Sequence, residues 1–134
     1  MPGTRTPRRR AGDVAEEAVA RHLSGNGWTI VARNVRVGRS ELDIVAIEPT
    51  PMPALVFVEV RSATVTRFGA PVESVDARKV SRLYRAAWAL VRAGRLPDGK
   101  ALPDIEWRVD LVTVMRQDGR AWQLAGHLRG LDPG

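Results

Sequence analysis

A six-residue stretch in the middle of the chain, Leu55–Val60, is apolar at every position but one. It follows a rigid, proline-rich turn at Pro49–Pro53. A short apolar run of this kind, next to a turn, is typical of a strand that is buried on both faces inside a sheet. A chain of 134 residues can enclose one such sheet in a single domain. We therefore expect the fold to be organised around this strand.

The segments on either side predict two helices and four further strands. Asp13 and Glu16 have the spacing of a capping box that begins the first helix, and Ser24–Gly27 ends it. Strands are expected at 28–37, 41–48, 105–115 and 120–128, and the second helix is expected at 72–93. This order predicts an α/β fold with a mixed central sheet of about five strands flanked by helices. Residues 12–130 then form one domain, and residues 1–11 form a disordered basic arm.

The composition excludes several classes of protein. The chain has no cysteine and two histidines, which excludes a disulfide scaffold, an iron–sulfur cluster and a cysteine nucleophile, and makes a histidine-rich metal site hard to build. The longest unbroken apolar run, Ala86–Val91, is far too short to cross a membrane. No secretory signal follows the basic N-terminus. We expect a cytoplasmic protein that does not bind membranes.

Positive charge is concentrated at the N-terminus. The net charge is +6, and the first ten residues hold four arginines and no acid. Such an arm is either a solvated tail or a segment that binds nucleic acid by releasing counterions, and its composition alone does not decide between the two. We expect nucleic acid, most simply DNA, as the partner, and a homodimer is compatible with the sequence.

Three acids lie inside predicted strands rather than in loops. Glu41 and Asp43 are two residues apart and share one face of their strand, and Glu59 interrupts the central apolar strand. Arg61 lies on the same face as Glu59. Paired carboxylates beside a cation suit a Mg²⁺ ion and phosphate chemistry. The alternative is that Glu59 and Arg61 form a simple ion pair while Glu41 and Asp43 are solvated.

Asp43 followed by Glu59-Val60-Arg61 resembles the Asp…(Asp/Glu)-X-Lys signature of restriction-endonuclease-like nucleases. Several longer segments, between about Ala11 and Met115, are also similar to those of the YraN-type family of small bacterial proteins. The matching segments are Ala15-Glu16 with His22-Leu23, Ser40–Ala46, Val56–Arg61, Gly69–Pro71 with Glu73 and Val75, Lys79, and Arg82-Leu83. Members of that family are predicted endonucleases, related in fold to archaeal Holliday-junction resolvases.

The resemblance implies a restriction-endonuclease-like core and assigns roles to individual residues. Asp43 and Glu59 would bind Mg²⁺ or Mn²⁺, Glu16 and Glu41 would be supporting acids near the metal, and Arg61 takes the position of the signature lysine. Glu16 also has the spacing of a helix cap, and both roles stay open for it.

Two positions depart from the family pattern. Ser40 replaces a glycine at the entrance of its strand. Arg61 replaces the lysine, and a guanidinium keeps its proton, so it can hold charge and hydrogen bonds but cannot accept a proton from water. Lys79 could supply an amine instead if it points toward the site.

Basic residues near the acids form a candidate surface for the phosphates of nucleic acid. They are Arg33, Arg36, Arg39, Arg67, Arg78, Lys79 and Arg82. The four tryptophans lie in periodic apolar patterns, so we expect them in the core rather than as platforms for bases. Backbone or shape recognition is favoured over the reading of base sequence.

Together these features predict a divalent-metal-dependent endonuclease that hydrolyses phosphodiesters, and the resemblance to the family implies structured or branched DNA as the substrate. One alternative is a nucleic-acid-binding module that kept the nuclease fold but lost turnover with Arg61. The other is a protein-interaction domain in which Glu59 and Arg61 have a purely structural role.

Overall fold

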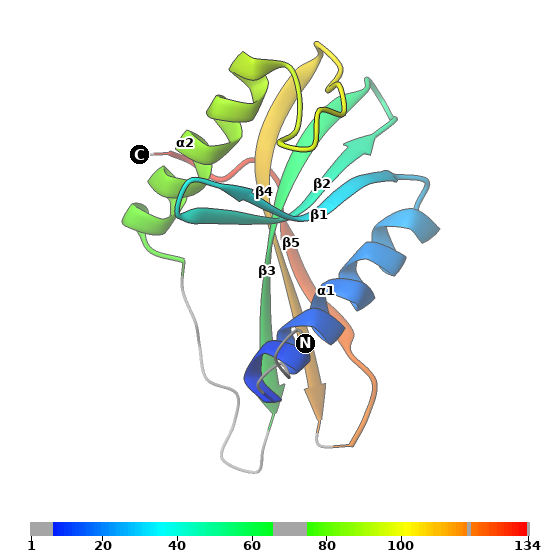
Figure 1. Cartoon of the computed structure of the whole chain (residues 1–134). Helices are drawn as coiled ribbons and strands as arrows, with labels where there is room; N and C mark the ends of the chain where they lie inside the picture. The colour runs from blue at the N-terminus through cyan, green and yellow to red at the C-terminus, as the bar shows by residue number, and fades with distance from the viewer. Residues whose placement is uncertain (1–6, 66–74, 118, 134) are drawn as a thin grey trace.

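The computed structural model describes residues 7–65, 75–117 and 119–133, and it shows two helices and five strands in the predicted order (Figure 1). The elements are α1 (Pro7–Gly25), β1 (Thr29–Val37), β2 (Ser40–Glu48), β3 (Ala54–Val65), α2 (Ala77–Ala93), β4 (Glu106–Gln117) and β5 (Gln123–Leu128). Among these residues no helix is both long and apolar enough to cross a membrane.

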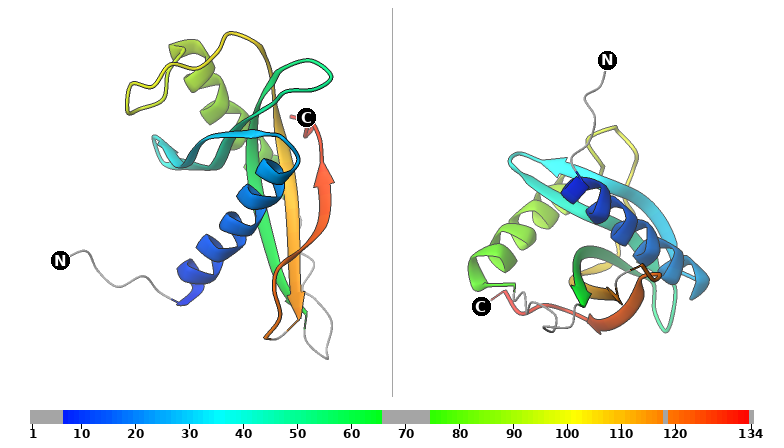
Figure 2. Two further views of the ribbon diagram at one scale, coloured as in Figure 1. Left: turned by 90° about the vertical axis from the view of Figure 1, so that its right-hand side faces the viewer. Right: turned by 90° about the horizontal axis from the view of Figure 1, so that it is seen from below.

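The five strands form one mixed sheet in the order β1-β2-β3-β4-β5. β3 and β4 are parallel and pair from Ala54↔Glu106 to Val65↔Gln117, and the other neighbouring strands are antiparallel. Figure 2 shows β3, β4 and β5 running side by side. Parallel neighbours need a crossover connection, which α2 provides. The predicted mixed five-stranded sheet, with the apolar strand at its centre, is confirmed.

Two hydrophobic clusters pack on opposite faces of this sheet. Val56 and Val58 of β3 belong to the cluster that contains the buried face of α1. Leu55 and Phe57 belong to the cluster that contains the buried face of α2. Because successive residues of a strand point to opposite faces, α1 and α2 cover opposite faces at β3. This burial explains why the strand is apolar on both sides.

The helices begin at different residues from those predicted. α1 begins at Pro7, so the last five residues of the expected disordered arm lie in the helix, and Asp13 lies inside the helix rather than at its cap. Proline is favoured at the first position of a helix because it lacks the N–H that would have no partner there. α2 begins after Asp76, whose side chain accepts a hydrogen bond from the Lys79 N–H at 2.8 Å. The earlier positions 72–74 of the predicted helix lie outside the described residues.

The tryptophans differ in burial, and one prediction about them is wrong. Trp28 is buried, and Trp107 and Trp122 are partly buried, as expected for core residues. Trp88 is 52% exposed on α2. Its ring stacks on that of Trp107, with 6.3 Å between ring centroids, so the apolar pattern reflects a contact at the edge of the core.

A buried ionic network joins β2, β4 and β5. Asp110 is fully buried and accepts hydrogen bonds from Arg108 Nε, the His127 ring and the Gly130 N–H. Burial by itself would raise the pKa of Asp110, but the hydrogen bonds from His127 and Arg108 hold the pKa below its usual value. Arg108 also donates to Glu48 Oε1 at 2.8 Å, so one guanidinium bridges two buried acids.

Replacing Arg108 should destabilise the protein far more than replacing an exposed arginine. Arg108→Leu leaves the buried Asp110 and Glu48 carboxylates undercompensated, and we expect a loss of about 3 kcal/mol in the free energy of unfolding. Arg21→Leu removes an exposed ion pair with Glu17 and should lower the free energy of unfolding far less. Urea denaturation of both variants measures the difference, and equal losses would contradict a structural role for the network.

Candidate functional site

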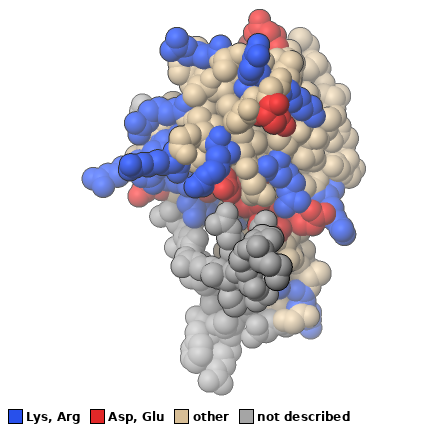
Figure 3. Space-filling view, in the orientation of Figure 1, with Lys and Arg blue, Asp and Glu red and all other residues tan. Residues whose placement is uncertain are grey.

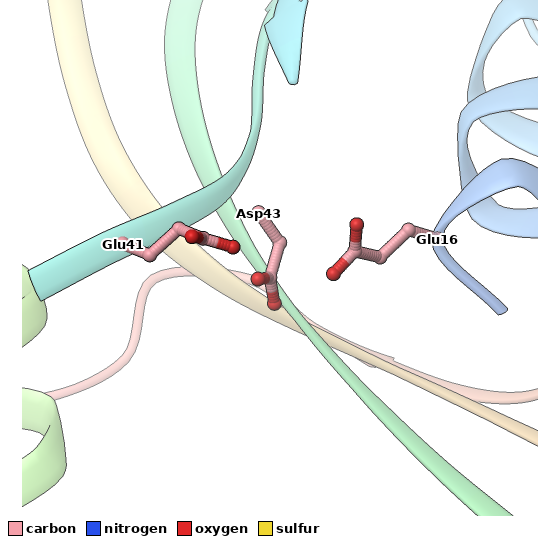
Figure 4. A group of neighbouring side chains, drawn as sticks. All are labelled: Glu16, Glu41 and Asp43. Atoms are coloured by element: carbon pink, nitrogen blue, oxygen red, sulfur yellow. The ribbon is translucent and has the colours of Figure 1, made fainter. Parts of the chain in front are cut away.

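Acids from two elements converge near the start of β2. Glu41 and Asp43 lie on β2, and Glu16 reaches them from α1 (Figure 4). One carboxylate oxygen from each of the three lies within 4.8 Å of the others. Strand alternation places Glu41 and Asp43 together, as predicted, and the packing of α1 on the sheet adds Glu16.

Glu59 joins this group from β3. β2 and β3 are antiparallel neighbours, with Ile44 paired to Val58, so Asp43 and Glu59 occupy the next positions along. The Val60 N–H donates to Asp43 Oδ2 at 2.8 Å, which fixes the Asp43 carboxylate against β3. Glu59 is 6% exposed, and its Oε2 atom is buried with no donor in reach among the described residues.

Burial and the neighbouring carboxylates disfavour the charged forms of Glu16, Asp43 and Glu59. Burial and, after it, the Asp43 charge raise the pKa of Glu59 from its ordinary value of 4.5 to about 7. The same two causes raise the pKa of Glu16 to about 7. Burial also raises the pKa of Asp43, partly offset by the hydrogen bond from Val60. Bringing these acids together therefore has a cost that nearby positive charge can reduce.

The structure excludes one of the two roles left open for Glu16. A helix cap is ruled out, because α1 begins at Pro7 and Glu16 lies inside it. Its carboxyl instead faces Asp43, which contributes to its raised pKa. Arg33 of β1 lies 3.9 Å from Glu16 Oε2 and also pairs with Glu17. Glu16 is a member of the acid cluster.

Two cations from different elements face Glu59. Arg61 Nη2 and Lys79 Nζ each lie 3.8 Å from Glu59 Oε1. Arg61 is the next residue but one on β3, and Lys79 comes from the first turn of α2. The amine of Lys79 therefore points at the acid cluster, as it must if it is to stand in for the amine of the signature lysine. The Glu59–Arg61 ion pair also exists, so it accompanies the acid cluster rather than replacing it.

Asn34 is a site residue that the sequence analysis missed. With its amide nitrogen oriented toward the acids, Asn34 donates to Glu16 Oε2 at 2.8 Å and to Glu41 Oε1 at 3.2 Å. Its φ of +53° turns the β1 backbone at this point. Asparagine is one of the few residues that tolerate this conformation, so an Asn inside an apolar strand was the available signal.

Of the other predicted basic residues, Arg36 contacts the cluster and lies 3.7 Å from Glu41. Arg36, Arg39, Arg78 and Arg82 are all exposed to solvent. Figure 3 shows Lys and Arg side chains gathered on the side of α2 and the β1–β2 turn, with acidic groups among them. Arg67 lies outside the described residues.

The donor set fits a hard divalent cation. Glu16, Glu41, Asp43 and Glu59 supply oxygen ligands only, which Mg²⁺ and Mn²⁺ prefer. Glu59 Oε2 has no hydrogen-bond partner among the described residues, and the pKa values of Glu16 and Glu59 stay raised although cations lie nearby, so the charge of these acids is only partly compensated. Among the described residues there is no cluster of cysteine and histidine side chains of the kind that favours zinc.

The raised pKa values predict how stability depends on pH in metal-free buffer. Between about pH 4.5 and 7 the folded protein keeps protons on Glu16 and Glu59 that the unfolded chain releases. Their contribution to stability is thus fully present below about pH 4.5 and is lost as the pH rises through about 7. Glu59→Gln should therefore raise the free energy of unfolding at pH 8, by on the order of 1 kcal/mol or more, and much less at pH 5.

Thermal or chemical unfolding in EDTA, compared between the two proteins across this pH range, measures the effect. The difference between the proteins removes the contribution of the histidines, which both contain. A gain that does not change with pH would contradict the charge cluster.

Comparisons with known proteins identify the family of this chain. Residues 15–114 match uncharacterised protein family UPF0102. A UPF0102 protein of Corynebacterium efficiens is 36% identical over 132 residues, covering 97% of this chain and 98% of that protein. One from Chloroflexus aurantiacus is 36% identical over 115 residues, covering 86% and 87%. One from Sorangium cellulosum is 44% identical over 86 residues, covering 64% of this chain and 58% of that protein.

Among solved structures, the chain is similar to SfsA of Pyrococcus furiosus in complex with Ca²⁺. The TM-score is 0.42 and the identity 20%, over 93% of this chain and 65% of that one. The family match covers most of the chain and confirms the resemblance found in its motifs. The chain belongs to uncharacterised protein family UPF0102, the YraN-type family of restriction-endonuclease-like proteins.

Proposed function

We propose that the protein is a divalent-metal-dependent endonuclease that hydrolyses phosphodiesters in structured or branched DNA. The observation that carries this proposal is the convergence of Glu16, Glu41, Asp43 and Glu59 beside the Lys79 amine. Membership of a family of nuclease type supports it.

Asp43 and Glu59 would hold the cation, with Glu16 and Glu41 as further ligands or acceptors for its waters. Mg²⁺ or Mn²⁺ bound there supplies a Lewis acid that neutralises charge on the phosphate and favours ionisation of water. Asn34 and the Val60 N–H hold Glu16, Glu41 and Asp43 in position before the cation arrives. Such preorganisation lowers the cost of assembling a charged site.

In this proposal Arg61 and Lys79 together take the roles that one lysine has in the family signature. Arg61 stays charged and can stabilise the negative phosphate, but it cannot take a proton. Lys79 brings an amine to the same oxygen of Glu59, and it can donate hydrogen bonds to both the attacking water and the phosphate.

A second function, a nucleic-acid-binding module without turnover, is favoured by one observation. Arg61 occupies the lysine position and lies against Glu59, where it can hold that carboxylate away from a cation. Binding and cleavage assays on the same branched DNA distinguish the two functions.

The cation site is tested by calorimetry with Mn²⁺ and by cleavage of branched DNA. Asp43→Asn and Glu59→Gln should each abolish Mn²⁺ binding and lower cleavage by at least about a hundredfold, since each removes a charged ligand. Asp104→Asn removes an equally sized charge from an exposed position and should change neither. Unchanged Mn²⁺ binding in both site variants would contradict the metal assignment.

The division between Arg61 and Lys79 is tested by rescue. Lys79→Met removes the amine but keeps the apolar stem, and should lower cleavage about tenfold or more, or about 1.4 kcal/mol of barrier. Arg61→Lys should raise cleavage by a similar factor. The double variant should recover the activity that Lys79→Met loses, because an amine again faces Glu59. Full activity of Lys79→Met, beside an inactive Asp43→Asn, would exclude this role for Lys79.

A further inference from the structure

A pocket of about 290 Å³ lies between the β1–β2 turn and α2. Its walls are formed by Val37, Gly38, Ser40, Arg82, Arg85 and Ala86. None of the four acids of the candidate site lines it. β1 and β2 are joined by a two-residue turn, since Val37 pairs with Ser40. Gly38, with a φ of +60°, allows this tight turn and brings the backbone close to α2.

The chemistry of the lining selects an anion. Arg82 and Arg85 are three residues apart and therefore neighbours on one side of the helix. No described acid lines the pocket or forms an ion pair with either guanidinium. Two adjacent positive charges without an acidic partner repel each other, and a phosphate group relieves this repulsion with charge-assisted hydrogen bonds. Ser40 adds a hydroxyl donor.

The residues of the pocket are neighbours along the chain of residues in the acid cluster, on two elements. Ser40 directly precedes Glu41 on β2. On α2, Arg82 and Arg85 follow Lys79 by three and six residues, or about 4.5 and 9 Å along the helix axis. A strand that places one phosphate at the acids can therefore place a neighbouring phosphate in this pocket. Figure 3 shows Lys and Arg side chains gathered over α2 and the β1–β2 turn.

We infer that this pocket binds a backbone phosphate of the DNA strand, next to the phosphodiester that lies at the acid cluster. This inference rests on the proposed function and adds the path of the strand, from the acids across the β1–β2 turn to α2. The pocket has no aromatic lining to stack a base, and its apolar walls, Val37 and Ala86, carry no group that reads one. The contact therefore positions the strand without sequence preference.

The test compares two double variants that each remove two positive charges, one pair from the pocket and the other from the C-terminal end of α2 and just beyond it. Arg82→Gln with Arg85→Gln empties the pocket of cations, whereas Arg92→Gln with Arg95→Gln removes two exposed arginines that do not line it. Binding of a labelled branched DNA with single-stranded ends is measured by anisotropy in EDTA, over a range of salt concentrations. EDTA separates the measurement from cleavage and from the metal.

The pocket pair should weaken binding by roughly tenfold, because a charge-assisted phosphate contact is lost. Its log–log salt slope should become shallower by about 0.7, the value for one phosphate on a single strand. The control pair should change both quantities much less. Equal losses in the two double variants, with DNA binding intact in the unaltered protein, would overturn the pocket and leave the proposed function standing.

A titration with inorganic phosphate separates the remaining outcomes. Backbone amide signals of Gly38 and Ser40 should shift with phosphate in the unaltered protein, and not in the Arg82→Gln, Arg85→Gln variant. If the unaltered protein binds no DNA even at low salt, both the proposed function and the strand path are overturned. A persisting phosphate response would then assign the pocket to a small phosphorylated molecule instead.

Discussion

The hydrogen bond from the Val60 N–H to Asp43 Oδ2 holds the candidate site together at the place where β2 meets β3. It fixes a carboxylate beside the partly buried carboxyl of Glu16 and the buried carboxyl of Glu59, whose pKa values burial and the Asp43 charge raise to about 7. Among the described residues the cations face the outer acids at 3.7–3.9 Å, and no salt bridge reaches Asp43 itself. The centre of the cluster is thus where positive charge is most lacking, and where a cation would bind with the greatest gain.

The remainder of the fold supports this arrangement. α1 and α2 cover opposite faces at β3 and are held by two separate apolar clusters. Each helix supplies one side chain to the acid cluster, Glu16 from α1 and Lys79 from α2. The ionic network of Glu48, Arg108 and Asp110 joins the far end of β2 to β4, and it contains none of the four acids of the candidate site. A stable core and an electrostatically strained site thus occupy different parts of one sheet, as expected where function costs stability.

Much of this was predictable from local patterns. The apolar run at Leu55–Val60 placed a strand at the centre of the sheet, and strand alternation placed Glu41 with Asp43. The resemblance to the nuclease signature grouped Asp43 with Glu59, and the antiparallel pairing of β2 with β3 brings their positions together. What local patterns do not contain is the register of a helix on a sheet. For that reason the sequence allows Glu16 to be either a helix cap or a supporting acid near the metal, and it does not determine where the Lys79 side chain points.

Asn34 and Trp88 show two other limits. Asn34 reaches the acids because β1 turns through a positive φ, a backbone feature that a side-chain pattern does not reveal. Trp88 has helical spacing but lies at the margin of the buried face, where stacking on Trp107 replaces full burial.

Anomalous diffraction from crystals grown at pH 8 and soaked in Mn²⁺ tests whether the four acids form a divalent-cation site. One ordered peak is expected between Asp43 and Glu59, about 2.0–2.4 Å from their carboxylate oxygens, with Glu16 or Glu41 in its coordination or water shell. No peak at saturating Mn²⁺, or a peak away from these carboxylates, would contradict the proposed cation site.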